Sequence, residues 1–279
     1  MECQLCQNKI LEKILDLGLH PPPLVLLTEE DLKKNVEEKF PLEIVFCENC
    51  GLLQLSNIVD PKKLFIDYSY TSSSSASFKK HLHDFAFNLY DRFNLSDNDL
   101  VIDIASNDGT LLQGFQEKNV RVLGVEPSKV AKIAKTNGVP TINDFFNETV
   151  SEQIVSKYGK SKIITATNVF AHVDKLHSMM LGIKNLMDTN SVFVSESHYV
   201  LDLIEKLQYD TIYHEHLRFY GLSQLVQLFQ KYNMDIFDVE RISTHGGSIR
   251  VYSCLSNSFK KSVEVDKILQ LEKEKQIST

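Results

Sequence analysis

Two pairs of cysteines near the start of the chain carry the clearest chemical signal. Cys3 and Cys6 form one pair, and Cys47 and Cys50 form the other. Two intervening residues let both thiolates of a pair turn toward one ion, and two such pairs complete a tetrahedral zinc site. Four protein ligands leave no open position, so zinc here would stabilise the fold rather than take part in a reaction. A redox-active pair or a chance spacing is the alternative.

A second group of candidate residues follows a short apolar strand expected at 100–104. The loop after it is tight and leads into a helix, and its small residues would let the backbone approach a ligand. Asp103 could accept a hydrogen bond from an amino group, although the loop lacks the G-x-G-x-x-G pattern of dinucleotide sites. The candidate contacts of this loop are Asp103, Ala105, Ser106, Asn107, Gly109, Thr110 and Leu111.

Three further strand ends carry polar or aromatic residues in chain order. Glu126 comes about twenty residues after the first loop, a spacing that suits a carboxylate binding both ribose hydroxyls. Asp144 could bind an adenine amino group while Phe145 covers the ring, and the segment from Asn168 would form the floor. Each acid alone could equally be a strand-end cap or a solvated group. Together, the candidates are Glu126, Pro127, Asp144, Phe145, Asn168 and Phe170.

The elements that must position these residues alternate between strands and helices from residue 97 onward. Strands are expected at 100–104, 120–125, 141–142, 162–167 and 191–195, with helices between them. Such alternation with short connections predicts a mostly parallel α/β sheet, whose ligand sits beyond the carboxyl ends of the strands. Two later strands, 234–240 and 248–255, flank Gly246 and Gly247 and predict an antiparallel hairpin that closes the sheet.

The predicted domain order follows from this pattern. Residues 1–64 form a small zinc-binding module, 65–96 a Tyr/Ser-rich connector and helix, and 97–256 the α/β domain. The connector could be a flexible spacer, yet Tyr68 and Tyr70 are unusual in a spacer. Residues 257–279 are expected to form a charged helical tail without a core of its own.

Composition narrows the functional classes. The 279 residues are 43% hydrophobic and 24% charged, which excludes a largely disordered chain. A net charge of −7 disfavours a protein that binds nucleic-acid phosphates. No apolar run approaches the roughly 20 residues of a membrane span, and the first residues do not resemble a secretory signal. We therefore expect a cytoplasmic protein, a monomer or weak oligomer, without nucleic-acid or membrane partners.

These motifs together resemble the S-adenosylmethionine-dependent sugar C-methyltransferases, which act on nucleotide-linked 4-keto-deoxyhexoses. The similarity runs from Cys3 to about Leu255. Family members usually continue into a further C-terminal domain, so the resemblance implies that the tail at 257–279 is the start of such a domain. The matching segments are the paired-cysteine module, Tyr68-Ser-Tyr70-Thr-Ser-Ser73, Ile104-Ala-Ser-Asn-Asp-Gly-Thr-Leu-Leu112, Gly124-Val-Glu-Pro127, Asn168-Val-Phe-Ala-His-Val173, Tyr213-His-Glu-His216 and His245-Gly-Gly-Ser-Ile-Arg-Val-Tyr252.

The resemblance implies a class I methyltransferase fold that binds S-adenosylmethionine and structural Zn²⁺ and takes a nucleotide-sugar substrate. C-methylation beside a ketone needs a base for the α-proton and donors for the enolate oxygen. A histidine suits the base role, so His216 is the candidate base, with Glu215 able to orient it. Tyr213 and either Tyr68 or Tyr70 could donate to the oxygen, and His172 could act as a second base or proton relay.

Several alternatives stay open at this point. The His214-Glu215-His216 run could be a metal site or a solvated helix start. His81, His83 and His177 are most simply solvated helix positions, whereas His198 and His245 could line the acceptor pocket or simply pack. At the level of function, the rivals are an O- or N-methyltransferase for another small molecule and a catalytically silent zinc- and cofactor-binding module.

Overall fold

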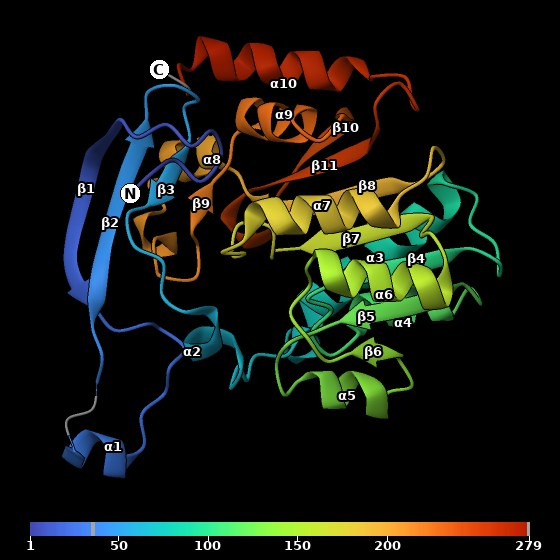
Figure 1. Cartoon of the computed structure of the whole chain (residues 1–279), viewed down its shortest axis with the longest axis horizontal. Helices are drawn as coiled ribbons and strands as arrows, with labels where there is room; N and C mark the ends of the chain where they lie inside the picture. Colours follow the sequence, from blue (N-terminus) through green and yellow to red (C-terminus); the bar gives the residue numbers. More distant parts are fainter. Residues whose placement is uncertain (35–36, 278–279) are drawn as a thin grey trace.

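A computed structural model describes residues 1–34 and 37–277 and shows two β-sheets (Figure 1). The larger sheet has seven strands in the order β10-β11-β8-β7-β4-β5-β6. Its parallel part rests on short apolar strands that are buried on both faces, as the sequence predicted. The strands are β4 (Leu100–Ile104), β5 (Arg121–Val125), β6 (Thr141–Ile142), β7 (Ile163–Thr167), β8 (Val192–His198), β10 (Met234–Ile242) and β11 (Ser248–Leu255).

The predicted antiparallel hairpin is confirmed. β10 pairs with β11, and β11 pairs antiparallel with β8, so the hairpin extends the parallel sheet at one edge. The remaining neighbours in this sheet, from β8 to β6, are parallel. The carboxyl ends of β4, β5, β6, β7 and β8 therefore meet at the same edge, which is where a ligand is expected.

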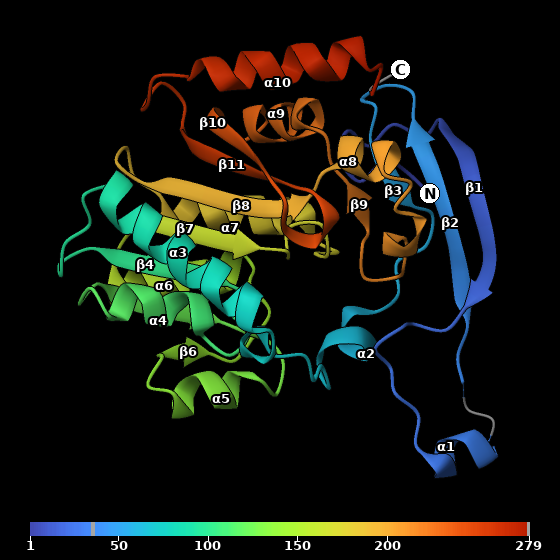
Figure 2. The same cartoon turned by 180° about the vertical axis from the view of Figure 1, so that it is seen from behind.

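Helices cover both faces of the large sheet. On one face α3 and α4 pack with α5 against Val101, Ile163 and Val192. α3 and α4 lie in front of the sheet in Figure 2. On the other face α6, α7 and α9 pack against Ile102 and Ile164. The helices are α3 (Ala76–Arg92), α4 (Thr110–Gln116), α5 (Ala131–Thr136), α6 (Glu148–Tyr158), α7 (Leu176–Leu186), α8 (Val200–Glu205), α9 (Leu222–Gln230) and α10 (Val263–Glu274).

The smaller sheet is antiparallel and combines residues from distant parts of the sequence. β1 (Leu11–His20), β2 (Phe40–Cys47) and β3 (Leu53–Leu55) come from the N-terminal region, where the helices α1 (Glu29–Lys34) and α2 (Pro61–Phe65) also lie. Its fourth strand is β9 (Arg218–Phe219), which pairs with β3. The N-terminal region thus shares its sheet with the segment that carries the predicted base.

The C-terminal tail is helical, as predicted, and it packs on the α/β domain. α10 contacts α9 and β10. Glu272 is only 2% exposed. Its carboxylate accepts hydrogen bonds from the backbone N–H groups of Leu222 and Ser223 at 2.5 and 2.9 Å and from the Tyr199 hydroxyl at 2.9 Å. A carboxylate at the start of α9 satisfies otherwise unpaired N–H groups and complements the helix dipole.

No helix among residues 1–34 and 37–277 has the length and apolar character needed to cross a lipid bilayer.

Candidate active site

A cavity of about 810 Å³ opens at the carboxyl ends of the parallel strands. The loops after β4, β5, β6 and β7 contribute to its wall, together with the last residue of β8, the connector and the segment before β9. This is the position that the predicted sheet topology assigns to the ligand. The sequence-predicted residues found in the wall are Tyr68, Tyr70, Ala105, Asn107, Glu126, Pro127, Asp144, Phe145, Asn168, His172, Tyr213 and His216.

Seven predicted site residues lie behind this wall: Asp103, Ser106, Gly109, Thr110, Leu111, Phe170 and Glu215.

The loop after β4 turns some of its side chains away from the cavity. Ala105 and Asn107 have positive φ angles of 53° and 52°. Ser106 points inward beneath Gly124, where a Cβ atom on the glycine would lie 2.3 Å from the serine Oγ. Gly109 has φ 80°, and a Cβ there would approach Val139 Cγ2 to 2.8 Å. A side chain at Gly109 or Gly124 would therefore clash with Val139 or Ser106. Ala105 and Asn107 line the cavity, whereas Ser106 does not.

Asp103 lies under the cavity floor rather than in its wall. The Thr165 hydroxyl donates a hydrogen bond of 2.7 Å to one carboxylate oxygen. Burial raises the pKa of Asp103 to about 7. Asp103 is therefore buried and does not contribute to the cavity wall. Phe170 is also displaced from the predicted site: it is fully buried, with ring centroids 5.6–5.9 Å from those of Phe193, Tyr220 and Phe229.

Glu126 is the most constrained acid in the cavity wall. The side chain is 4% exposed, and its two oxygens accept hydrogen bonds of 2.9 Å from the backbone N–H groups of Asn107 and Ser128. Each carboxylate oxygen has further lone pairs that can accept a hydroxyl hydrogen. Glu126 is therefore fixed in place while it can still accept hydrogen bonds from a diol. Asp144, by contrast, is exposed at the rim.

The tyrosine-containing connector is fastened to the loop after β4. The Asn107 side chain donates to the Tyr70 carbonyl at 2.9 Å and accepts from the Ser72 N–H at 2.8 Å. Asp108 accepts from the Ser73 N–H at 2.9 Å. The connector is therefore not a free spacer. It holds Tyr68 half-buried in the wall, with its ring centroid 6.3 Å from that of the more exposed Tyr70.

His216 lies at the centre of an aromatic cluster in the cavity. Its ring centroid is 4.0 Å from Tyr213, 4.4 Å from His198 and 4.9 Å from His172. Nδ1 lies 2.6 Å from the Thr211 carbonyl oxygen, which can only accept, so Nδ1 carries the hydrogen and Nε2 keeps its lone pair. Burial and the neighbouring imidazoles hold the pKa of His216 well below 6.5. The ring is thus neutral and able to accept a proton at Nε2.

Glu215 does not orient His216 as the sequence suggested, because the Thr211 carbonyl does so. Glu215 is 1% exposed, and its Oε1 has no hydrogen-bond partner within the described residues. Burial raises its pKa to about 7. The pKa values of Tyr213 and Tyr68 are both raised, mainly by burial and to a smaller extent by the charge of Glu215. The carboxylate therefore acts electrostatically on the two tyrosines.

The four N-terminal cysteines form a compact cluster. All four sulfur atoms lie within 4.8 Å of one another, with Cys3–Cys50 and Cys6–Cys47 separations of 3.5 Å. Zinc–sulfur bonds of about 2.3 Å in a tetrahedron place sulfurs about 3.8 Å apart, so the donor set fits one Zn²⁺ ion. Within the described part of the chain, no other cluster of three or more His, Cys, Asp or Glu ligands was found, which disfavours a metal at His214 and His216.

A family model described as a "putative zinc binding domain" matches residues 3–65, and one described as a methyltransferase domain matches residues 78–239, more than half of the chain. The chain belongs to the methyltransferase family. It is 32% identical over 253 residues to the C-methyltransferase NovU of Streptomyces niveus; the match covers 90% of this chain and 60% of that relative's length.

Solved structures support the same fold. An S-adenosylmethionine-dependent methyltransferase from Clostridium acetobutylicum aligns with 64% of this chain and 92% of its own, at 15% identity and a TM-score of 0.50. A Pyrococcus horikoshii protein aligns with 71% of this chain and 97% of its own, at 12% identity and the same TM-score. The class I fold predicted for this methyltransferase, with its mostly parallel sheet and antiparallel hairpin, is confirmed.

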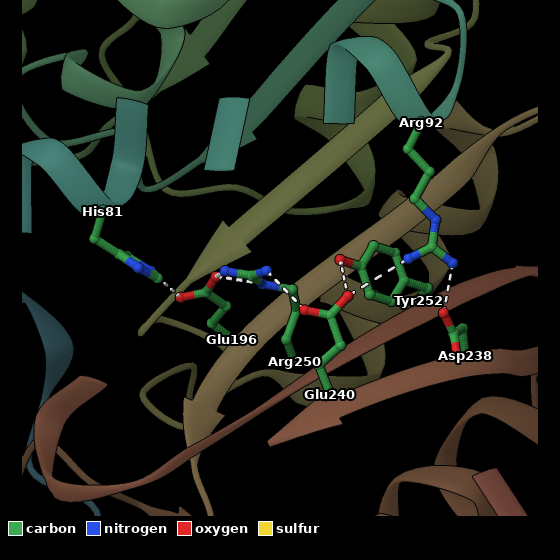
Figure 3. A network of polar contacts seen from close by, with 7 residues as sticks. All are labelled: His81, Arg92, Glu196, Asp238, Glu240, Arg250 and Tyr252. Carbon is green, nitrogen blue, oxygen red and sulfur yellow. Dashed lines mark hydrogen bonds and ion pairs between the residues drawn. The ribbon is translucent and has the colours of Figure 1, made fainter. Parts of the chain in front are cut away.

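A buried ionic network lies next to the active site of this methyltransferase (Figure 3). Glu196, at the end of β8, is fully buried and accepts hydrogen bonds from Arg250 at 2.6 Å. His81 of α3 lies 2.9 Å from the other carboxylate oxygen, so it is not the solvated residue that the sequence suggested. The other two helix histidines also have partners: His83 lies 2.9 Å from Glu117, and His177 contacts the Tyr232 hydroxyl.

Two histidines of uncertain role in the sequence, His198 and His245, prove to line the cavity. His198 ends β8, so the strand-end rule that identified His172 after β7 also accounts for its position. His245 precedes a pair of glycines in the hairpin turn, where the strand-end rule does not apply.

Proposed function

We propose that this methyltransferase transfers a methyl group from S-adenosylmethionine to a carbon beside the ketone of a nucleotide-linked keto-deoxysugar. The observation that carries the proposal is a neutral, oriented His216 in the same cavity as Glu126. A base for a carbon acid is unnecessary for simple O-methylation of an acidic hydroxyl. The 32% identity to a named C-methyltransferase supports the same reaction class.

The cofactor-binding part of the cavity comprises Glu126, Phe145 and Asn168. Glu126 would accept the two ribose hydroxyls, because its carboxylate is already held by two backbone N–H groups. Phe145, beside the exposed Asp144, would cover the adenine ring. When bound, S-adenosylmethionine supplies an electrophilic methyl group on a sulfonium sulfur. The residues present therefore fit this cofactor.

The reacting part of the cavity comprises His216, Tyr213 and Tyr68. His216 would take the α-proton at Nε2, while the Thr211 carbonyl holds the imidazole through Nδ1. Tyr213 and Tyr68 would donate hydrogen bonds to the developing enolate oxygen, since their raised pKa values keep both phenols protonated. His172 stacks on Phe65 at a centroid distance of 6.2 Å and would shape the opposite side of the pocket.

Two lysines of the cavity wall could contact a phosphorylated substrate. Lys62 and Lys175 both contribute to the lining, which they share with the carboxylates of Asp60, Glu126, Asp144, Glu148 and Asp174. We expect a Lys62→Gln/Lys175→Gln double variant to raise KM for the nucleotide-linked sugar and to leave KM for the free sugar unchanged. Equal effects on both substrates would contradict recognition of the nucleotide.

Exchange of the α-proton tests the carbon-acid chemistry directly. With a nucleotide-linked keto-deoxysugar in heavy water and without cofactor, the wild-type protein should incorporate deuterium beside the ketone. His216→Gln should reduce this exchange by about 100-fold or more, the range for loss of a general base. Binding of S-adenosylhomocysteine should stay unchanged, which serves as the folding control. Methyl transfer to oxygen without exchange would refute the proposal and favour an O-methyltransferase.

A further inference from the structure

The proposed reaction produces one proton per turnover at a buried position. The C–H bond beside the ketone breaks, and its proton goes to His216 Nε2. The electron pair of the enolate forms the new C–C bond, and the S–CH₃ pair stays on sulfur, which becomes neutral. His216 therefore remains protonated after the methyl transfer. Because His216 is only 3% exposed, this proton needs a route to solvent before the next turnover.

A row of imidazoles leads outward from His216 along the cavity wall. The ring centroids of His216 and His198 are 4.4 Å apart, and those of His198 and His245 are 6.0 Å apart. Exposure increases in the same order: His216 is buried, His198 half-buried and His245 exposed. Separations of this size are bridged by direct contact or by one water, which is sufficient for proton transfer.

The outer end of the row is held in place although it is exposed. His245 lies in the turn between β10 and β11 with φ 51°, followed by Gly246 at 81° and Gly247 at 140°. The Gly246 carbonyl accepts hydrogen bonds from Lys206 at 2.6 Å and from Gln208 at 2.9 Å. A left-handed conformation is uncommon outside glycine, and histidine is one of the few other residues that adopt it. The turn therefore presents an imidazole at a fixed place beside His198.

The charges around the row favour movement of a proton outward. Burial and neighbouring imidazoles lower the pKa of His216 strongly and that of His198 to about 4. At His245 burial and the charge of His81 lower the pKa, but the Glu196 carboxylate opposes them. The Phe78 ring contacts both His245 and His81, with centroid distances of 5.1 and 5.9 Å. Among the described residues Glu196 is bonded to His81 and not to His245, and His245 is exposed, so the row ends in solvent.

We propose that His198 and His245 form a proton-exit route that returns His216 to its neutral state after each turnover. The inference rests on the proposed function, since it takes its proton from the carbon acid. It assigns a task to the His245-Gly-Gly segment, which the proposed chemistry otherwise leaves without one.

His245→Asn provides the test, because asparagine tolerates the left-handed backbone and lacks the imidazole. At low buffer concentration, steady-state kcat should fall about 10-fold or more. The rate of a single turnover with enzyme in excess should stay within about twofold, because the first proton transfer to His216 is intact. High concentrations of imidazole buffer should restore kcat. His20→Asn, which changes an exposed histidine outside the cavity wall, should leave all three quantities unchanged.

Other outcomes separate the two proposals. A His245→Asn variant with normal steady-state kcat would overturn the exit route and leave the proposed function standing. Equal losses in single and multiple turnovers, without rescue by imidazole, would show a structural role and would also overturn the route. Absence of α-proton exchange and of C-methylation in the wild-type protein would overturn the proposed function, and the route with it.

Discussion

The pairing of Glu196 with Arg250 leads to a stability prediction that can be worked from the structure. Glu196 is 0% exposed, and its main cationic partner is the Arg250 guanidinium at 2.6 Å. Arg250→Met would leave this carboxylate buried with His81 as its one remaining polar side-chain partner among the residues that the structure describes. Breaking a buried pair from one side costs about 3–5 kcal/mol. At roughly 2–4 °C per kcal/mol for a domain of this size, the melting temperature should fall by about 6–20 °C.

The same variant should be more sensitive to alkaline than to acidic conditions. Burial raises the pKa of Glu196, but the His81 hydrogen bond and the Arg250 charge outweigh it and lower the pKa in the native protein. The pair therefore stabilises above the unfolded pKa of 4.5, and its contribution is lost as pH falls. Without Arg250, burial dominates and the folded pKa rises, so the protein should lose more stability at about pH 8 than at about pH 5.

Thermal unfolding followed by circular dichroism at both pH values would measure these effects. Adding Glu196→Gln to Arg250→Met should recover part of the loss at alkaline pH, because it removes the unpaired charge. Lys267→Met breaks the exposed pair with Glu264 and should shift the free energy of unfolding by less than about 1 kcal/mol. Identical losses in the single and double variants, or a loss independent of pH, would refute the reasoning.

Three further predictions concern the metal, the cofactor and acid stability. Cys47→Ser should abolish binding of one equivalent of Zn²⁺, measured by elemental analysis, whereas Cys254→Ser should retain it because that thiol is buried in the other sheet. Glu126→Gln should weaken S-adenosylhomocysteine binding by about 10-fold or more in calorimetry, since a hydrogen bond to a charged group contributes about 1.5–3 kcal/mol. The urea concentration at the unfolding midpoint should decrease as the pH is lowered below 6.5. Burial lowers the folded pKa of His198 to about 4 and that of His172 to about 3, so in this pH range the unfolded chain binds protons that the folded protein does not.

The sequence was sufficient to locate the cofactor edge of the sheet because the relevant signals are local. Glu126 directly follows a short apolar strand, and parallel strands bring such ends to one edge whatever the details of packing. The same rule placed Asn168 and His172. Hydrophobic patterning and the glycine pair also predicted the β10–β11 hairpin.

Features set by long-range pairing could not be predicted in this way. Asp103 lies near the end of a short apolar strand, as Glu126 does, yet its carboxylate is buried beneath the cavity. There it accepts a hydrogen bond from Thr165, which is 62 residues later in the sequence. His81 appears on a helix with a polar face, and only the fold brings it to Glu196, 115 residues away. Sequence spacing says which residues share an element, but side-chain partners across the sheet depend on how the elements pack.

The shared sheet gives the zinc-binding region a position in the chemistry as well as in the fold. The loop that carries His216 runs directly into β9, which pairs with β3 of the N-terminal sheet. The Leu217 carbonyl accepts from the Leu55 N–H at 3.0 Å, while the Leu217 N–H donates to the Ala171 carbonyl at 3.1 Å. The proposed base is therefore clamped between the N-terminal sheet and the floor of the cofactor cavity. Because displacements of about 1 Å can reduce a rate 100-fold, we infer that disordering the cysteine cluster lowers kcat through His216 as well as lowering stability.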